Sequence, residues 1–159
     1  MPIIDALPQT LLAFDNDVFT HLRNRKPHIQ EKLKTYFLHT SQVPALPAIT
    51  VFEALNGVDE QSSNKKISSN EANFRKQQIR NLTKVHEILA FNEKSAEIAS
   101  FVCSKLGKSK SNKLWYDIFI VATAISHNYG LATGNKKDVE LIANNLPDNL
   151  DLILAIWKP

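Results

Sequence analysis

The stretch WYDIFIVATAISHNYGLATGNKKDVELI, residues 115–142, decides the fold. Its apolar run is much shorter than the ~20 residues that a membrane-spanning helix needs, so it predicts a buried helix over residues 114–128. A turn at Tyr129 and Gly130 leads into a short strand, residues 131–133, and then into a second helix, residues 139–144. Helices and short strands in such close succession are typical of a parallel sheet covered by helices.

The same alternation continues through the rest of the chain. Asp15, Pro27, Thr50 and Asn92 are suited to helix starts, whereas Gly57 and Gly107 are suited to helix ends. The pattern predicts a single domain over residues 1–159, a three-layer α/β/α sandwich with a short, mainly parallel central sheet. The further strands are expected at residues 10–14, 47–49, 88–91 and 150–157. The further helices are expected to begin after Asp15, at Pro27 and near Phe74, and two more are expected to span residues 51–56 and 93–106.

Two polar stretches between these elements are predicted to be loops. Residues 60–70 are rich in Ser, Asn and Lys and are expected to form a mobile loop, and residues 107–113 are basic and rich in Ser. In the long helix that is expected to follow residues 60–70, Phe74, Ile79 and Val85 are expected near the buried side.

Composition limits the possible classes of protein. The chain has 43% hydrophobic residues, enough for a core without a disulfide, and its single Cys103 excludes an intramolecular disulfide. With no apolar leader at its start, a cytoplasmic protein without membrane segments is expected. The net charge of +3 favours polyanions only mildly. Basic residues gather at 23–26, 65–66, 75–80, 105–113 and 136–137, where each group by itself is explained by a solvated surface.

Three acids and an amide stand where an α/β sheet places active groups, at the carboxyl ends of strands and in the helices that follow. They are Asp15, Glu53, Asp117 and Asn135. Each acid alone has a structural explanation: Asp15 as a helix cap, Asp117 as a first-turn acid that favours the helix dipole, and Glu53 as a polar-face residue.

Together, the acids fit a hard divalent cation. Mg²⁺ and Mn²⁺ prefer oxygen ligands, and clustered carboxylates without a cation would repel one another. Such a metal lowers the pKa of a bound water and neutralises charge on a phosphate in transit, so hydrolysis of phosphodiester bonds is the corresponding chemistry. Neighbouring Lys and Arg residues would hold the nucleic-acid backbone.

Three motifs in order resemble the PIN-domain family and, within it, the VapC-like toxins of toxin–antitoxin pairs. LLAFDNDVFTHL (residues 11–22) is similar to the opening strand with its first acid, PAITVFEALNGV (residues 47–58) to the second motif, and residues 115–142 to the third. The resemblance implies a Mg²⁺- or Mn²⁺-dependent endoribonuclease that acts on RNA, forms a homodimer and is blocked by an antitoxin protein. The implied catalytic residues are Asp15, Glu53, Asp117, Asn135 and Asp138, of which the first four would bind the metal and Asp17 would take the accompanying polar position.

Two other functions compete with this hypothesis. A PIN-like module that binds RNA or protein without cutting is one, because Asn135 stands where a fourth acid would be. A generic nucleotide-binding α/β module is the other, but the chain lacks the glycine-rich fingerprint that such a module needs.

Overall fold

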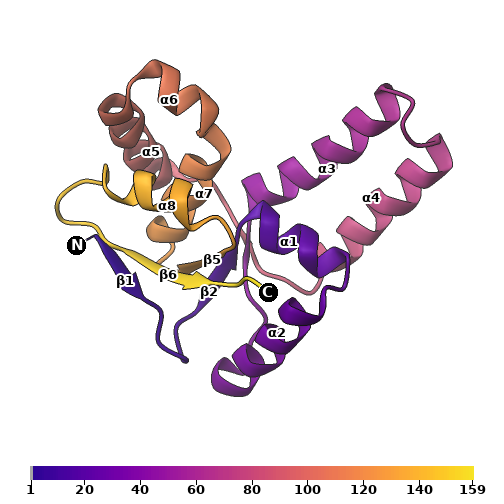
Figure 1. Ribbon diagram of the computed structural model, residues 1–159, viewed down its shortest axis with the longest axis horizontal. Coiled ribbons are helices and arrows are strands. Elements are labelled where there is room, and N and C mark those ends of the chain that lie inside the picture. Colours follow the sequence, from indigo (N-terminus) through magenta and orange to yellow (C-terminus); the bar gives the residue numbers. More distant parts are fainter. Residues whose placement is uncertain (1) are drawn as a thin grey trace.

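A computed structural model of the protein describes residues 2–159. One or more helices separate most successive strands along the chain, and the paired strands are parallel (Figure 1). The strands are β1 (Ile3–Asp5), β2 (Leu12–Phe14), β3 (Leu46–Pro47), β4 (Ile88–Leu89), β5 (Gly130–Thr133) and β6 (Leu152–Ile156). The helices are α1 (Asn16–Arg23), α2 (Pro27–Thr40), α3 (Ala48–Ser63), α4 (Ser69–Thr83), α5 (Glu93–Leu106), α6 (Lys108–Lys113), α7 (Trp115–Ser126) and α8 (Lys136–Ala143).

The sheet is built around the last strand. Four strands lie in the order β1-β6-β5-β2, and β3 pairs with β4 in a second, two-stranded sheet. The backbone N–H of Ala45 donates to the Leu12 oxygen, and the N–H of Phe14 donates to the Ala45 oxygen. These bonds connect β2 to the chain just before β3, so the two sheets continue one another.

Side chains alternate across the sheet and bury a core on each face. Leu131, Leu152 and Leu154 pack with α5, α7 and α8, whereas Phe14 and Ala132 pack with α1, α2, α3 and α4. The three-layer α/β/α architecture with a mainly parallel sheet is therefore confirmed. Among residues 2–159, no helix is both long and apolar enough to span a membrane.

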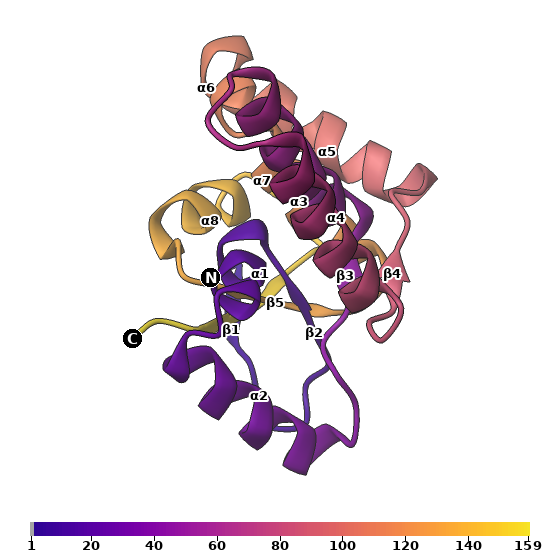
Figure 2. The ribbon, with the colours of Figure 1, turned by 90° about the vertical axis from the view of Figure 1, so that its right-hand side faces the viewer.

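The main departures from the sequence-based expectations lie in the two polar stretches. The loop predicted over residues 60–70 is shorter than expected and spans only residues 64–68: α3 runs through Gly57 to Ser63, and α4 begins at Ser69, capped by the Ser68 side chain. The two helices form a hairpin whose halves lie side by side (Figure 2). Residues 108–113 form the short helix α6, so the second predicted loop was wrong.

Smaller differences concern the edges and ends of elements. Strand β1 was not predicted, and α8 starts at Lys136, before the expected residue 139. Phe74 and Val85 are 60% and 63% exposed, so only Ile79 of those three expected buried residues lies in the core. Thr50 does not cap α3: the helix begins at Ala48, and the Thr50 hydroxyl bonds elsewhere.

Candidate functional site

The carboxyl ends of β2 and β5 open into a polar pocket of about 170 Å³. Asp15 directly follows β2, and Asn135 follows β5 by two residues; Glu53 comes from the second turn of α3, and Asp117 comes from the first turn of α7. The pocket is lined by Asp15, Asn16, Asp17, Glu53, Asp117 and Asn135. Four of the five residues expected at the site thus face one space.

Asp15 is held on both sides by hydrogen bonds. It is 5% exposed, and its Oδ1 accepts a bond of 2.9 Å from the backbone N–H of Val18, which makes it the cap of α1. Its Oδ2 accepts a bond from the hydroxyl of Thr133, a fully buried residue at the end of β5. The side chain of Asp15 therefore caps α1 and lines the pocket at the same time.

A second buried hydroxyl brings Glu53 into the pocket. The Oγ1 of Thr50, also fully buried, donates a bond of 2.9 Å to the backbone oxygen of Phe14 at the end of β2. This bond holds the first turn of α3 against the strand that precedes Asp15. Glu53 lies one turn further along α3, and its Oε1 is buried without a hydrogen-bond partner.

The pocket disfavours negative charge on its own acids. Burial, and secondarily the charges of Asp117 and Asp15, raise the pKa of Glu53 to about 7. Burial raises the pKa of Asp15 to about 7, against the lowering effect of its bonds from Thr133 and Val18. Burial likewise raises the pKa of Asp117 to about 6, with contributions from the charges of Asp138 and Asp17. The acids therefore lie close enough to sense one another.

The donor set fits a hard divalent cation. Every polar side chain lining the pocket offers oxygen, and two of these oxygens, Oε1 of Glu53 and Oδ1 of Asn16, are buried without a partner. A buried acceptor without a donor is costly, and a cation would satisfy it. Within residues 2–159, however, no three His, Cys, Asp or Glu side chains already converge as a ligand group. The side chains therefore line one space but do not form a ready-made ligand shell.

Asp138 does not line the pocket. It lies behind Asn135, whose Nδ2 donates a bond of 2.7 Å to the Asp138 carboxylate, while Asn135 Oδ1 accepts from the Asp138 backbone N–H. Asn135 therefore caps α8 and holds Asp138 at the same time. Asp138 reaches the pocket only through its charge, which helps to raise the pKa of Asp117.

Two contributors were not among the expected site residues: Asn16 lines the pocket, and Thr133 bonds Asp15. Asp17, expected at the accompanying polar position of the first motif, lines the pocket as well. Thr133 had no sequence signal, because a Thr at the end of a strand is ordinary β structure until its partner 118 residues away is known.

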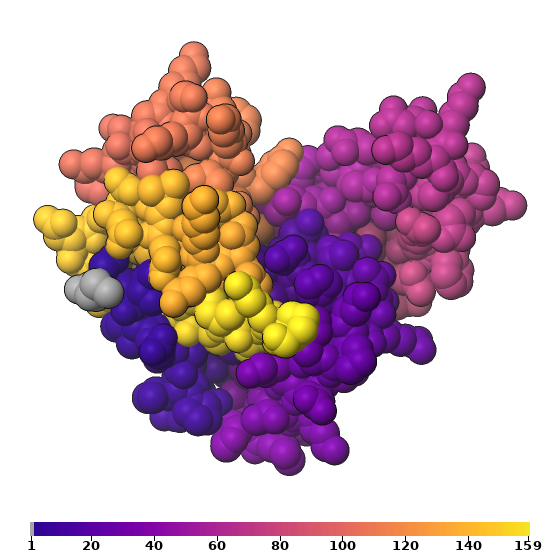
Figure 3. Space-filling view, viewed as in Figure 1, coloured from indigo at the N-terminus to yellow at the C-terminus, as the bar shows by residue number. Residues whose placement is uncertain are grey.

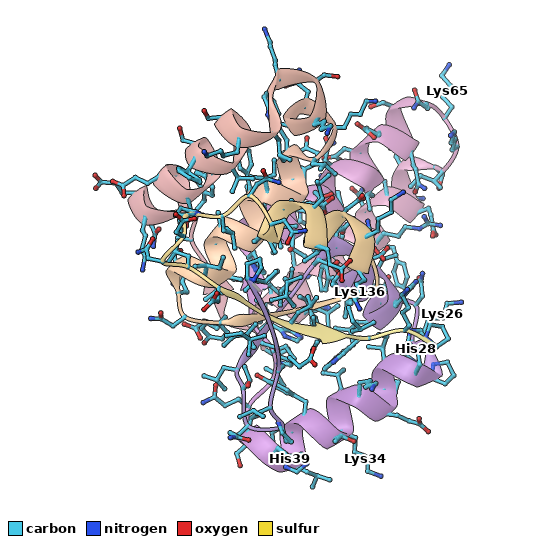
Figure 4. The ribbon with its side chains drawn as sticks, turned by 60° about the vertical axis from the view of Figure 1, so that its left-hand side comes forward. Lys26, His28, Lys34, His39, Lys65 and Lys136 are labelled. Carbon is cyan, nitrogen blue, oxygen red and sulfur yellow. The ribbon has the colours of Figure 1, made fainter. Side chains whose placement is uncertain are left out.

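The basic groups of the sequence do not all surround this pocket. Lys65 projects from the far end of the α3–α4 hairpin, and Lys34 projects from α2, whereas Lys136 lies on the first turn of α8 (Figure 4). Lys136 forms an exposed ion pair of 3.5 Å with Glu140. The surface is notched between the α3–α4 hairpin and α6 (Figure 3).

Comparisons with known proteins agree with this architecture. The family model described as PIN domain matches residues 13–143. Among solved structures, the chain is similar to VapBC2 from Rickettsia felis bound to a DNA fragment from their promoter, with 18% identity, a TM-score of 0.68, and coverage of 93% of this chain and 99% of that chain. DNA-bound VapBC from Salmonella typhimurium gives 18% identity, a TM-score of 0.67, and coverage of 94% and 99%.

A third solved structure extends the series. A toxin–antitoxin complex from Klebsiella pneumoniae gives 20% identity, a TM-score of 0.58, and coverage of 80% of this chain and 88% of that chain. At these identities, the solved structures show a shared fold. The comparison with curated proteins found no match.

Proposed function

Because the chain belongs to the PIN-domain family, we propose that it is a metal-dependent endoribonuclease and the toxin of a toxin–antitoxin pair. The observation that carries this proposal is the pocket at the ends of β2 and β5, which four carboxylates line and in which burial raises the pKa of three of them, Asp15, Glu53 and Asp117. The toxin assignment is supported by the fold shared with a toxin–antitoxin complex.

Asp15, Glu53, Asp117 and Asn135 would hold Mg²⁺ or Mn²⁺. When bound, the cation would lower the pKa of a water and neutralise charge on the scissile phosphate. The chain's own residues prepare this: Thr133 and the Val18 N–H fix Asp15, and Thr50 fixes the turn that carries Glu53. Asp138 would act indirectly, by orienting Asn135.

The raised pKa values link metal binding to pH. A carboxylate near pKa 7 keeps its proton in a substantial fraction of molecules at neutral pH. A cation must displace that proton, so metal affinity is expected to increase as the pH rises from about 6 to about 8.

The proposal is tested by RNA cleavage. Purified protein, freed of any copurified inhibitor, is incubated with mixed-sequence RNA in Mn²⁺, in Mg²⁺ and in chelator. We expect cleavage in either metal and none in chelator. Asp117→Asn keeps the shape of the side chain but removes a ligand charge, and we expect it to lower the rate at least a hundredfold. Asp148→Asn, at an exposed carboxylate outside the pocket, is the matched control and is expected to cut normally.

A second candidate is a module that binds RNA or protein without cutting it. It is favoured by one observation: within residues 2–159, no three acids or histidines are already gathered around a common point. Mn²⁺ binding without cleavage, from folded protein, would favour this function. Loss of cleavage in both chelator and Asp117→Asn would exclude it.

The assembly is also a proposal. An antitoxin that blocks the pocket and a homodimer of this chain follow from the proposed toxin role. Sedimentation of the purified chain with and without its co-expressed partner measures both, and a monomer at all concentrations would contradict the homodimer.

A further inference from the structure

Two histidine side chains meet where the end of α1 faces the start of α2. His21 lies in the last turn of α1, and His28 lies in the first turn of α2. Their ring centroids are 5.3 Å apart, with an angle of 72° between the ring planes. Within residues 2–159, Nδ1 of His21 and Nε2 of His28 are both buried, and neither has a hydrogen-bond partner. Because a buried polar atom without a partner is costly, the pair gains from a ligand that both nitrogens can bind.

Two other histidines of the chain use a ring nitrogen in a different way. His86 Nδ1 lies 2.6 Å from the backbone oxygen of Pro44, and His127 Nε2 lies 2.8 Å from the backbone oxygen of Ala90. Each of these rings bonds a backbone carbonyl and connects two segments of the chain. The pair between α1 and α2 has no such bond at its two buried nitrogens, so packing explains the position of the rings but not the unpaired atoms.

The backbone of the α1–α2 turn holds the two histidines in place. The N–H of Lys26 donates a bond of 3.0 Å to the oxygen of His21, and the N–H of Arg25 donates a bond of 3.0 Å to the oxygen of Leu22. Arg25 takes a left-handed conformation with φ 53°, and Pro27 opens α2 with a fixed φ. Since the turn is short and hydrogen-bonded, the rings are positioned before any ligand binds.

The separation of the rings matches that of two imidazoles on one metal ion. A zinc–nitrogen bond is about 2.0–2.1 Å long, which places the centre of a bound imidazole about 3.2 Å from the metal. Two such rings at a tetrahedral angle of about 109° have centres about 5.2 Å apart. The separation in this chain is 5.3 Å.

We propose that His21 and His28 bind a transition-metal cation of the Zn²⁺ class, through Nδ1 of His21 and Nε2 of His28. Imidazole nitrogen suits Zn²⁺ and Ni²⁺, whereas Mg²⁺ and Mn²⁺ prefer oxygen. Neither histidine lines the carboxylate pocket, so the site differs from it in place and in chemistry and does not depend on the proposed function. Within residues 2–159, no third His, Cys, Asp or Glu completes a ligand group, so water takes the remaining positions on the ion. The ion ties the end of α1 to the start of α2.

NMR of the histidine side chains tests the site directly. The full chain, labelled with ¹⁵N and stripped of metal, is titrated with Zn²⁺. We expect the signals of His21 Nδ1 and His28 Nε2 to shift together, whereas those of His39, at the other end of α2, should stay unchanged (Figure 4). Mg²⁺ at the same concentrations should leave the signals of His21 and His28 unchanged, because it does not favour nitrogen ligands.

Calorimetry on variants measures what each ring contributes. Loss of even an outer-shell partner weakens a metal site about tenfold or more, so His21→Gln and His28→Gln are each expected to weaken Zn²⁺ binding at least tenfold. His39→Gln, at an exposed histidine of the same helix, is the matched control and should bind Zn²⁺ as the unaltered chain does. Zn²⁺ at about ten times its Kd should raise the Tm of the unaltered chain by about 3–6 °C, and at that concentration the two variants should lose most of this gain. Circular dichroism checks that each variant is folded.

Two outcomes would overturn the inference. Signals of His21 and His28 that do not respond to Zn²⁺ would show that the pair is a packing contact alone. Equal Zn²⁺ affinity in the unaltered chain and in both glutamine variants would place the ion elsewhere, such as at the carboxylates. RNA cleavage in Mn²⁺ is measured independently, so failure of the histidine site and failure of the proposed function are distinguishable.

Discussion

At the scale of single residues, one hydroxyl group serves two parts of the pocket. Thr133 Oγ1 donates to Asp15 and accepts a bond of 3.0 Å from the backbone N–H of Asn135. It therefore couples the first acid to the residue that caps α8. Because the bond to Asp15 lowers the pKa of that acid, Thr133 partly offsets the effect of burial.

Replacing this hydroxyl tests the coupling. Thr133→Val keeps the volume of the side chain but leaves a buried Asp15 oxygen without its donor. We expect a loss of about 1–3 kcal/mol in the free energy of unfolding, measured in urea, and weaker Mn²⁺ binding because the Asp15 proton is held more tightly. Thr133→Ser, which keeps the hydroxyl, is the control. An equal loss in both variants would assign the effect to packing alone.

The raised pKa values predict how stability depends on pH. Asp15 and Glu53 shift from 3.8 and 4.5 to about 7, so the folded chain holds protons that the unfolded chain releases. Their stabilising contribution is fully present below about pH 4 and is lost as the pH rises through about 7. In chelator, the free energy of unfolding should fall across this interval. Added Mn²⁺ should restore more of it at about pH 8 than at about pH 5.

Denaturation at several pH values, with chelator and with Mn²⁺, measures this dependence. Asp117→Asn removes one acid of the cluster and should flatten the curve in chelator. A free energy of unfolding that rises with pH in chelator would contradict the raised pKa values.

The site residues that could be predicted from the sequence are those whose positions depend on neighbouring strands and helices. Asp15 and Asn135 follow strands, and Asp117 opens a helix, so the rule that strand ends meet at one edge brings them together. Thr133 and Thr50 act through bonds to residues 118 and 36 positions away, which no local pattern encodes. Nothing in the local sequence decides whether Asn135 or Asp138 faces the pocket. The turn of the backbone at the start of α8 decides it.

At the scale of helices and strands, two glycines that were both expected at helix ends differ. Gly57 lies inside α3 with open space around the position of a Cβ atom. Gly107 lies between α5 and α6 with φ +81°, a conformation that residues with a Cβ rarely adopt. The sequence predicted a helix end at both, and only Gly107 is one.

Alanine at each glycine should therefore have opposite effects. Gly107→Ala is expected to cost about 1–3 kcal/mol in the free energy of unfolding, because the backbone there is strained for alanine. Gly57→Ala is the matched control and should gain about 0.5–1 kcal/mol, since alanine favours a helix interior. Urea denaturation of both variants measures the difference. A loss of the same size in both would contradict the backbone assignment.

The α3–α4 hairpin shows why polar composition was misleading. Its residues are mostly solvated, so the stretch 60–70 resembles a loop in composition. A few buried contacts, made by Val58, Ala72 and Ile79, and the side-chain cap from Ser68 stabilise the helices instead. Tertiary packing of this kind overrides local propensity, and it is not visible in a sequence window.

At the scale of the whole molecule, β6 is central to the sheet. It pairs with β1 on one side and β5 on the other, and its residues Leu152 and Leu154 lie in the core. The alternation of strands and helices predicted the layers correctly. It could not predict β1, because three residues at a half-exposed edge carry too little pattern to be recognised.

Removing β6 or removing β1 from this sheet should have unequal effects. Deletion of residues 152–159 takes away a strand with two partners and part of the core, so we expect no cooperative thermal unfolding transition. Deletion of residues 2–5 removes an edge strand, and a lower midpoint with a retained transition is expected. Circular dichroism melts compare the two. A cooperative transition after loss of 152–159 would contradict the central role of β6.

The strand order β1-β6-β5-β2 also has a consequence for the order in which the sheet can form. Among residues 2–159, β1 pairs with β6 alone, and β6 is the last strand of the described part of the chain. Until β6 is made, β1 has no strand to pair with, and β5 lacks a partner on the edge opposite β2. The pocket at the ends of β2 and β5 therefore gains its full support only after β6 has paired, and because β1 and β6 lie far apart in the sequence, this pairing is expected to be a slow step of folding.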